Sequence, residues 1–457
     1  MRRVLIIGSD FVPSSLPPAT RVRFFVKHLP DFGWEPIVLT VDPKHYEAAV
    51  DTESLNLLAP SLKVLRASAF STRWTRKLGV GDIGMRSLWQ HWCVLKRICT
   101  QHPIDLIFIP APPYVPMVLG RLAHARFGIP YVIDYIDPWV TEFRWRLPRA
   151  ERPPKWRTAY WLARILEPFA LRKVSRITGV SKGTTDSVVC RYSWLSEEDA
   201  TEIPYGAEVS DFEYLRKNPR RNSIFDPNDG LLHVSYVGAY TPAMHTAVRA
   251  LFDAVRLGLE RASPNFQRLR LHFIGTSYAP NDGGPRQVLQ LAHDAGVKDL
   301  VAEHLRRIPY LESLQVMLDS HALLLIGSEE PHYTASKVFP CILAQRPLLS
   351  ILHEESSAAQ ILRETDASGP ITFSSELRPA EQVVKIAAQI ESILALSRAD
   401  KPNVRWNAFE PYTTRAMTAR LAYVFDKVLE ASRERGRSFE VPRIEVEKST
   451  VADPNEC

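Results

Sequence analysis

The sequence predicts an α/β protein built from two doubly wound domains and a long final helix. Three observations lead to this fold class. Short unbroken apolar runs alternate with amphipathic stretches, as expected of parallel strands that helices cover on both faces. The alternation begins again near Leu231, and polar side chains gather where apolar runs end. With 457 residues, the chain is long enough for two or three domains with cores of their own.

The first half of the chain alternates strands and helices in the order of a parallel sheet. Strands are expected at Val4–Gly8, Ile37–Val41, Leu62–Leu65, Asp105–Ile109, Tyr131–Ile136 and Ile177–Ser181. Helices are expected through Val22–Leu29, Arg86–Ile98 and Met117–Leu122. Residues 202–206 read as the last turn before the chain crosses over.

The second half repeats the pattern and indicates a second doubly wound sheet. Its expected strands are His233–Val237, Leu271–Ile274, Leu305–Ile308, Ala322–Ile326, Leu348–Leu352 and Ile371–Phe373. Its expected helices are Ala247–Leu259, Arg286–Ala295, Leu311–Leu318, Ser336–Ala344, Ala358–Arg363 and Ala380–Leu396. A last helix is expected at Thr413–Glu434, and residues 436–457 have the composition of a disordered tail.

The stretch from His321 to Leu352 contains the most polar of these strand ends. A buried strand leads into a loop with Ser328, Glu329, Glu330, His332, Tyr333 and Thr334. Ser336 is expected to cap the following helix, with Lys337 beside it. A strand's carboxyl end next to a helix start is where open α/β sheets bind phosphates. We therefore expect a phosphate-bearing ligand here.

Composition excludes several other classes of protein. No apolar run approaches the roughly 18 residues that span a bilayer, and the apolar run after Met1 is too short for a signal peptide. The five cysteines are widely spaced, which indicates a reducing cytoplasm and no disulfide framework. The sequence lacks GxxxxGK[ST], HExxH, GxGxxG and Asp-x-Asp motifs. We expect no metal and no bound cofactor.

Residues 142–176 hold ten Lys or Arg against three acids, interleaved with aromatic residues such as Trp145, Trp156 and Trp161. A solvated face is the commonest explanation for such a segment. A nucleic-acid surface is disfavoured because no recognition motif accompanies it. An anionic membrane surface suits the mixture of Trp and Arg. Pro168 is expected to end any helix there after about three turns.

Several stretches, in order, resemble the GT-B glycosyltransferases of the family-4-like (glycosyl transferase group 1) branch. They are VLIIGSDFVPSSLPPATRVRFFVKHLPDFGWEPIVLT, YVIDYIDPW, ITGVSKGTTDSV, IPYGAE, VSYVGAYTPAMHTAVRALFDAV, LHFIGT, IPYLESLQVMLDSHALLLIGS and the stretch from His321. The resemblance covers most of residues 4–430. It implies two Rossmann-like domains that face a cleft, with the C-terminal helix returning to the N-terminal domain.

The resemblance assigns expected roles to individual residues. Asp137, Lys337 and Glu329 are the catalytic candidates. The nucleotide-sugar donor is expected to contact Gly238, Gly275, Tyr310, Glu330, His332, Ser336 and Lys337. The acceptor is expected to contact Ser14, Ser15, Arg21 and Trp139. The sequence departs from the family where Lys337 takes the place of a Glu, and where Ser14-Ser15 and Pro17-Pro18 replace a Gly-Gly pair.

One motif points to another reaction class. Gly179-Val180-Ser181-Lys182-Gly183 matches G-x-S-x-G between a strand and a helix, as in a serine hydrolase. The sequence has no HGGG-type loop for an oxyanion hole, and a complete second sheet follows the motif. A non-catalytic GT-B scaffold and a sugar-nucleotide epimerase are also compatible with the sequence.

The expected organisation is an acceptor-binding domain over residues 1–208, a donor-binding domain over 209–410, a crossover helix over 411–435 and a tail over 436–457. The expected activity is transfer of a sugar from a nucleotide-sugar to a glycan or lipid-linked acceptor, in cell-surface polysaccharide or glycolipid synthesis. The resemblance implies that transfer is retaining and metal-independent. We expect a cytoplasmic protein, peripheral at the cytoplasmic face of the membrane, with no nucleic-acid partner.

Overall fold

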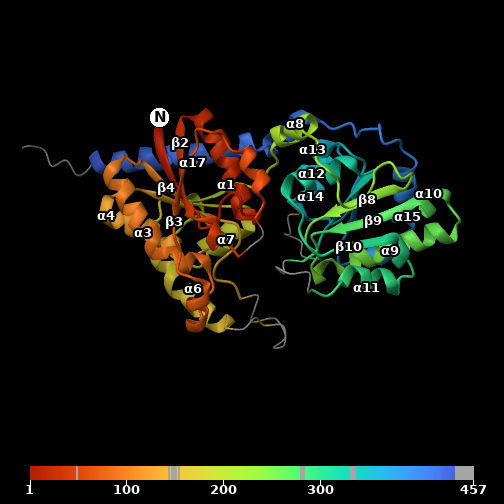
Figure 1. Ribbon diagram of the computed structural model, residues 1–457, viewed down its shortest axis with the longest axis horizontal. Helices are drawn as coiled ribbons and strands as arrows, with labels where there is room; N and C mark the ends of the chain where they lie inside the picture. Colours follow the sequence, from red (N-terminus) through yellow and green to blue (C-terminus); the bar gives the residue numbers. More distant parts are fainter. Residues whose placement is uncertain are drawn as a thin grey trace, which may run out of the picture.

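The computed structural model contains two parallel β-sheets, each flanked by helices (Figure 1). It describes residues 1–47, 50–142, 145, 152, 155–277, 284–329 and 336–437. The predicted α/β class with two doubly wound sheets is confirmed. The expected tail over 436–457 lies almost entirely outside the described residues, as do parts of the basic segment 142–176.

The N-terminal sheet has seven strands in the order β3-β2-β1-β4-β5-β6-β7, and every pair is parallel. The strands are β1 Arg2–Ile7, β2 Trp34–Val41, β3 Lys63–Ala67, β4 Leu106–Ala111, β5 Tyr131–Tyr135, β6 Arg176–Gly179 and β7 Ala200–Glu202. Its helices are α1 Pro17–His28, α2 Thr72–Thr75, α3 Ile83–Gln101, α4 Met117–Phe127, α6 Trp156–Leu171 and α7 Lys182–Val189.

The C-terminal sheet has six parallel strands in the order β10-β9-β8-β11-β12-β13. The strands are β8 Leu232–Val237, β9 Leu269–Ile274, β10 Val301–His304, β11 Ala322–Ile326, β12 Leu348–His353 and β13 Ile371–Phe373. Its helices are α8 Val209–Lys217, α9 His245–Glu260, α10 Pro264–Arg268, α11 Gln287–Asp294, α12 Tyr310–Asp319, α13 Val338–Ala344, α14 Ser357–Thr365, α15 Val383–Leu394 and α16 Trp406–Phe409. In both sheets the order reverses beside the first strand, which is where α/β folds bind ligands.

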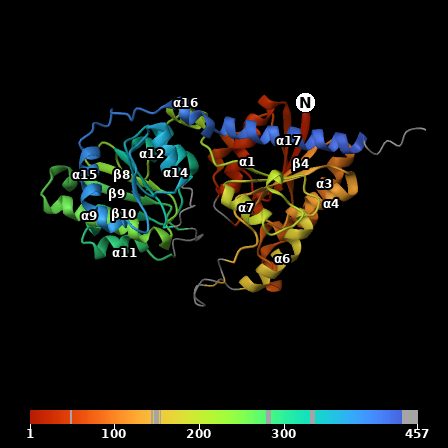
Figure 2. The same ribbon diagram turned by 180° about the vertical axis from the view of Figure 1, so that it is seen from behind.

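The last helix, α17 Thr414–Arg437, leaves the C-terminal sheet and lies along the N-terminal domain beside α1 (Figures 1 and 2). Its Phe425 ring meets Trp34 and Phe108 edge to face, with centroids 5.2 and 5.4 Å apart. Met417 and Leu421 are buried in the same core. The helix is therefore part of the N-terminal domain's hydrophobic core, although it comes last in the chain.

The chain crosses between the two sheets twice, and the two crossings lie side by side. Ala207 N donates to Tyr412 O at 3.4 Å, and Thr414 N donates to Ala207 O at 3.2 Å. A Cβ on Gly206 would lie 2.8 Å from Tyr412 O. Since real Cβ atoms do not approach a carbonyl so closely, only glycine allows this spacing.

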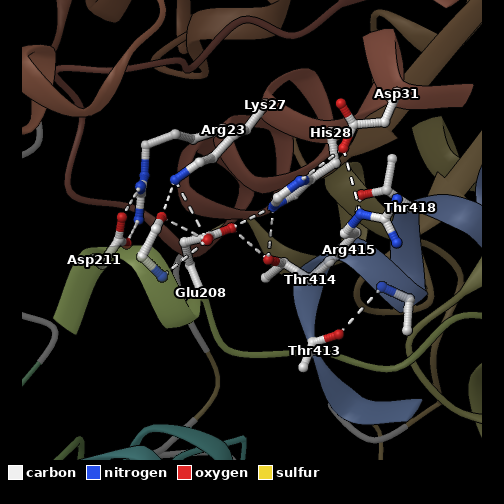
Figure 3. A network of polar contacts seen from close by, with 12 residues as sticks. Arg23, Lys27, His28, Asp31, Glu208, Asp211, Thr413, Thr414, Arg415 and Thr418 are labelled. Carbon is white, nitrogen blue, oxygen red and sulfur yellow. Dashed lines mark hydrogen bonds and ion pairs between the residues drawn. The ribbon is translucent and has the colours of Figure 1, made fainter. Parts of the chain in front are cut away.

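A polar network joins these crossings to α1 (Figure 3). The Glu208 carboxylate accepts hydrogen bonds from His28 Nε2 at 2.6 Å and from the hydroxyls of Thr414 and Ser210. Next to it, Arg23 pairs with Asp211 at 2.7 Å, and both side chains are buried. The network ties helix α1 to the start of α8 and to the start of α17.

The expected strand at Leu305–Ile308 is wrong. The edge strand that was expected around these residues is β10, four residues earlier at Val301–His304, in register with β9 from Leu271 to Ile274. The sequence does not predict β10 at this place because the strand contains the buried Glu303, and a carboxylate is not an expected core residue. Glu303 accepts hydrogen bonds from Thr276 Oγ1 at 3.0 Å and from Leu289 N at 2.9 Å, which is how its burial is tolerated.

Two other expectations need correction. Pro168 does not end helix α6, which continues to Leu171. Proline loses the hydrogen bond of its own nitrogen and crowds the carbonyl four residues earlier, but its fixed φ is helical, so the chain completes one more turn. Residues 200–202 form the short strand β7, which was not predicted, and the turn expected at 202–206 follows it. Among the described residues, no helix combines the length and apolar content needed to cross a bilayer.

Candidate functional site

Two glycines stand at the carboxyl ends of neighbouring strands in the C-terminal sheet, each beside a cation. Gly238 follows β8, and a Cβ there would lie 3.6 Å from Lys337 Cε. Gly275 follows β9 with a φ of +74°, and a Cβ there would lie 3.4 Å from Arg307 Cγ. Neither glycine carries a side chain that would fill the space next to these two cationic residues. This arrangement suits an anionic ligand that approaches the backbone closely.

The two cations influence each other. Lys337 is exposed as a residue. Protein atoms nevertheless crowd its ammonium, and the resulting loss of hydration lowers the pKa of that group. The charge of Arg307 lowers the same pKa further. A bound diphosphate would relieve the repulsion between the two cations, because it places negative charge between them. Among the described residues, no three His, Cys, Asp or Glu side chains form a group that could hold a metal ion.

Ser336 does not cap the helix as expected. Helix α13 begins at Val338 with Lys337 in the N-cap position, and no side chain caps it. Pro340 supplies the reason. If Ser336 were the cap, Pro340 would be the fourth helical residue, whose N–H must bond the cap's carbonyl. Starting one residue later places Pro340 in the first turn, where no N–H is needed.

Glu329 lies on the loop after β11 and is tied to the start of helix α9. Its N donates to Ala243 O at 2.8 Å, and its Oε1 accepts from Thr246 Oγ1 at 2.7 Å. The carboxylate is exposed, so one oxygen stays accessible to a ligand. Glu330 and His332, the other acidic and imidazole candidates of this loop, lie outside the described residues.

Tyr310, which the sequence predicts as a donor contact, is held by residues of the N-terminal domain and of α8. The Tyr310 hydroxyl donates to Asp211 Oδ2 at 2.9 Å, and its N donates to Asp51 Oδ2 at 2.8 Å. The Arg23 guanidinium lies 4.9 Å from the centre of its ring. Burial, followed by the charge of Asp211, raises the pKa of the hydroxyl well above its ordinary value. Tyr310 therefore connects the two domains.

On the N-terminal domain, Asp137 lies just past the end of β5. Its carboxylate meets solvent, while crowding by neighbouring atoms raises its pKa. The Tyr114 hydroxyl donates to the Asp137 carbonyl at 3.2 Å. The Tyr114 ring stacks on Trp139 with centroids 5.4 Å apart and planes 9° from parallel. A carboxylate beside a flat aromatic pair suits a sugar hydroxyl and ring.

The other three acceptor candidates sit deeper in the domain. Ser14 is buried, and its Oγ accepts from Leu16 N at 3.4 Å, while Ser15 is half-buried. Arg21 is 2% exposed and forms two hydrogen bonds with Asp134, at 2.7 and 3.0 Å. It also donates to the carbonyls of Ile203 and Pro204. Protein atoms thus occupy the guanidinium of Arg21, and its contact with an acceptor stays a prediction.

Sequence reasoning missed Asp10 and Arg307. Burial and the nearby charge of Asp82 raise the pKa of Asp10 to about 6, although a hydrogen bond with Ser14 opposes the shift. The available signal for Asp10 is its place, directly after the first buried strand in Gly8-Ser9-Asp10. Arg307 escapes notice when residues 305–308 are read as a strand.

The hydrolase motif at Ser181 has a structural explanation. Ser181 is the N-cap of α7 in extended backbone, and its Oγ accepts from Thr184 N at 3.2 Å. A second contact joins Ser181 Oγ and Thr184 Oγ1 at 3.0 Å. A nucleophile on a sharp turn needs an exposed, uncommitted hydroxyl. Here the Ser181 hydroxyl caps the N-terminus of α7 instead.

Comparison with protein families finds one similarity, in the N-terminal part of the chain. Residues 18–206 match the model of a glycosyl transferase 4-like domain. The match covers less than half of the chain and marks its N-terminal part as similar to that domain. No curated protein matches the chain. The similarity confirms the expected kind of enzyme, a glycosyltransferase.

Solved structures resemble this chain over nearly its whole length. A glycosyltransferase from Rickettsia africae ESF-5 is 11% identical, with 94% of this chain and 99% of that one covered and a TM-score of 0.58. Anabaena Alr3699/HepE in complex with UDP and glucose is 14% identical over 93% and 100%, with a TM-score of 0.57. A UDP-forming trehalose-phosphate synthase from Burkholderia xenovorans is 10% identical over 93% and 100%, with a TM-score of 0.59. Identities this low show a shared fold, which is GT-B.

Proposed function

We propose that this glycosyltransferase moves a sugar from a nucleoside diphosphate donor to a glycan or a lipid-linked carrier. The observation that carries the proposal is the pair of cations, Lys337 and Arg307, beside Gly238 and Gly275. As the sugar leaves, negative charge grows on the diphosphate, and fixed positive charges stabilise that state more than the ground state. Lys337 thereby takes the part that a metal ion plays in other transferases.

The reaction breaks the bond between the anomeric carbon and the diphosphate and forms a bond to an acceptor oxygen. The acceptor's proton must pass to a base, and Asp137 is our candidate, since its raised pKa makes it a better base near neutral pH. Tyr114 and Trp139 would hold the acceptor ring beside it. We propose retention of configuration and no metal, by resemblance to the family-4-like branch.

The similar Anabaena protein contains UDP and glucose, so uridine diphosphate sugars are the first donors to test. We also propose that the enzyme works in the cytoplasm, at the cytoplasmic face of the membrane, in cell-surface polysaccharide or glycolipid synthesis. Exposed aromatic and basic side chains on the N-terminal domain support this placement.

A thermal-shift screen across UDP-, GDP-, ADP- and TDP-sugars tests the donor proposal, because a ligand that binds the native state raises its melting temperature. At a concentration about 100 times Kd the stabilisation is about 2.7 kcal/mol. We expect one base to give a clear shift in the wild type. Absence of a shift with every donor would overturn the proposal. Binding without turnover on varied acceptors would favour a scaffold, and turnover without an acceptor would favour an epimerase.

A further inference from the structure

Helix α6 exposes three large apolar side chains in one row. Trp161, Ile165 and Phe169 are 59%, 66% and 44% exposed and follow one another at intervals of four residues. The opposite side of the helix is buried through Trp156, Ala163 and other residues, so the helix packs normally on the domain. Apolar side chains scattered over a surface are common, but a continuous row of this size marks a binding surface.

The charges on this outward side are all positive. Arg157 and Arg164 flank the apolar row on the surface of the helix, and Arg172 follows at its end; all three are exposed. Glu167 is the only acid between residues 155 and 173. It is buried and accepts hydrogen bonds from the hydroxyls of Tyr135 and Tyr192. The exposed side of α6 therefore combines aromatic, aliphatic and cationic groups without an acid.

A second segment has the same character. Phe70, Trp74 and Leu78 are again spaced by four residues, and Trp74 and Leu78 are 66% and 84% exposed. Residues 68–79 contain no acid, and the Lys77 ammonium lies 4.9 Å from the centre of the Trp74 ring. The polar partner of the aromatic group is thus a cation, as on α6.

The two segments adjoin each other. A Cβ on Gly79, which ends the second segment, would lie 2.8 Å from Lys155 Nζ, and Lys155 directly precedes α6. In both views of the ribbon, α6 lies at the end of the N-terminal domain away from α17 (Figures 1 and 2). The six apolar side chains of the two segments, with the cations among them, are called the docking surface below.

We propose that the docking surface binds an anionic lipid membrane. Trp places an apolar ring at the level of lipid headgroups, and Arg keeps its charge near lipid phosphates while its stem covers apolar surface. Each Lys or Arg close to such a membrane strengthens binding about fivefold. A second copy of this chain fits less well, because its net charge of +6 would repel the cations.

This inference rests on the proposed function for its purpose, since a lipid-linked acceptor lies in a membrane. Its test is nevertheless independent of sugar transfer. Membrane binding is measured without donor or acceptor, and donor binding is measured without vesicles. A protein that binds nucleotide-sugar but no vesicles refutes the docking surface alone, and the reverse result refutes only the donor site.

The experiment is flotation of the full chain with vesicles of phosphatidylcholine alone, or of phosphatidylcholine mixed with phosphatidylglycerol. We expect binding to the mixed vesicles only. Trp161→Ser with Ile165→Ser should weaken it about tenfold or more, because two inserted apolar side chains are lost. Trp74→Ser with Leu78→Ser should have a comparable effect. Both variants should melt like the wild type, because the side chains are exposed.

Val384→Ser is the matched control, since Val384 is 61% exposed on α15 of the C-terminal domain. It should bind vesicles like the wild type. The proposal is overturned by a wild type that ignores mixed vesicles, by equal binding to neutral vesicles, or by double variants that float as well as the control.

Discussion

His28 Nε2 and Glu208 Oε2 lie 2.6 Å apart and join the first helix of the chain to the crossing between the two sheets. Burial alone would raise the pKa of Glu208. The hydrogen bonds from His28, Thr414 and Ser210 outweigh burial and hold that pKa well below its ordinary value. Glu208 is therefore ionised at every pH where the protein is expected to work, and the junction depends on its charge.

Glu208→Gln should destabilise the protein by about 2–4 kcal/mol at neutral pH, because it leaves buried donors without a charged partner. A carboxylate with a depressed pKa stabilises the fold above its unfolded pKa of about 4.3. That contribution is lost as pH falls from there toward the folded value. The difference in free energy of unfolding between wild type and Glu208→Gln, measured by thermal unfolding, should therefore become smaller as the pH is lowered.

Glu53→Gln is the control for this prediction, since Glu53 pairs with Arg220 at 3.0 Å in an exposed site. Its cost should stay below about 1 kcal/mol at any pH. A gap for Glu208→Gln that stays constant into acid would show that the charge of Glu208 does not matter.

We expect the Arg21–Asp134 pair to stabilise the fold. Arg21→Met leaves Asp134 buried without its cation and should cost about 3–5 kcal/mol in urea unfolding. Adding Asp134→Leu removes the stranded charge and should recover much of that loss. Arg3→Met, which breaks an exposed pair with Glu35, is the control. If Arg21→Met instead folds normally and loses only acceptor affinity, Arg21 belongs to the acceptor site.

Gly206 should be essential to the spacing of the two crossings. Gly206→Ala places a Cβ against Tyr412 O, where only backbone could yield, and should cost about 1–3 kcal/mol. Gly183→Ala has open space within α7 and should stabilise by about 0.5–1 kcal/mol. The two melting temperatures should move in opposite directions. An unchanged melting temperature for Gly206→Ala would mean that the crossings separate freely.

Lys337→Ala should lower turnover about 10²–10³-fold, because it removes one charge that stabilises the departing diphosphate. Lys385→Ala, an exposed lysine of α15, should leave turnover unchanged. Gly238→Ala should fold normally but bind nucleotide-sugar more weakly, since its methyl group would occupy the space beside Lys337. If Lys337→Ala turns over like the wild type, the donor site lies elsewhere in the protein.

Ser181→Ala should cost about 1 kcal/mol through loss of the α7 cap, with no loss of activity per folded molecule. A serine-directed fluorophosphonate should leave activity intact. Stoichiometric labelling of Ser181 with loss of activity would restore the hydrolase interpretation.

The sequence is most informative where burial is apolar and local. The strands around Ile6, Phe108 and Leu324 are continuous apolar runs, and each lies within a few residues of its expected place. Gly238 and Gly275 can be predicted as site residues from the sequence because each directly follows an apolar strand, where a turn is expected. These features depend on neighbours in the chain.

Contacts with distant partners are not readable from the sequence. Arg21 looks like a free cation until Asp134, more than a hundred residues away, is placed against it. Tyr310 looks like a donor contact until Asp211 and Arg23 occupy its hydroxyl and its ring. Ser336 differs for a local reason, because Pro340 has no N–H to give to a helix that starts at that serine.

The position of α17 bears on how the protein is made. The N-terminal domain leaves the ribosome first, and domains generally fold in that order. Yet Phe425, which packs against Trp34 and Phe108, is synthesised only after the whole C-terminal sheet. Until then the nascent chain carries an uncovered apolar strip on its first domain. Completion of that domain therefore waits until the C-terminal sheet and α17 have been synthesised.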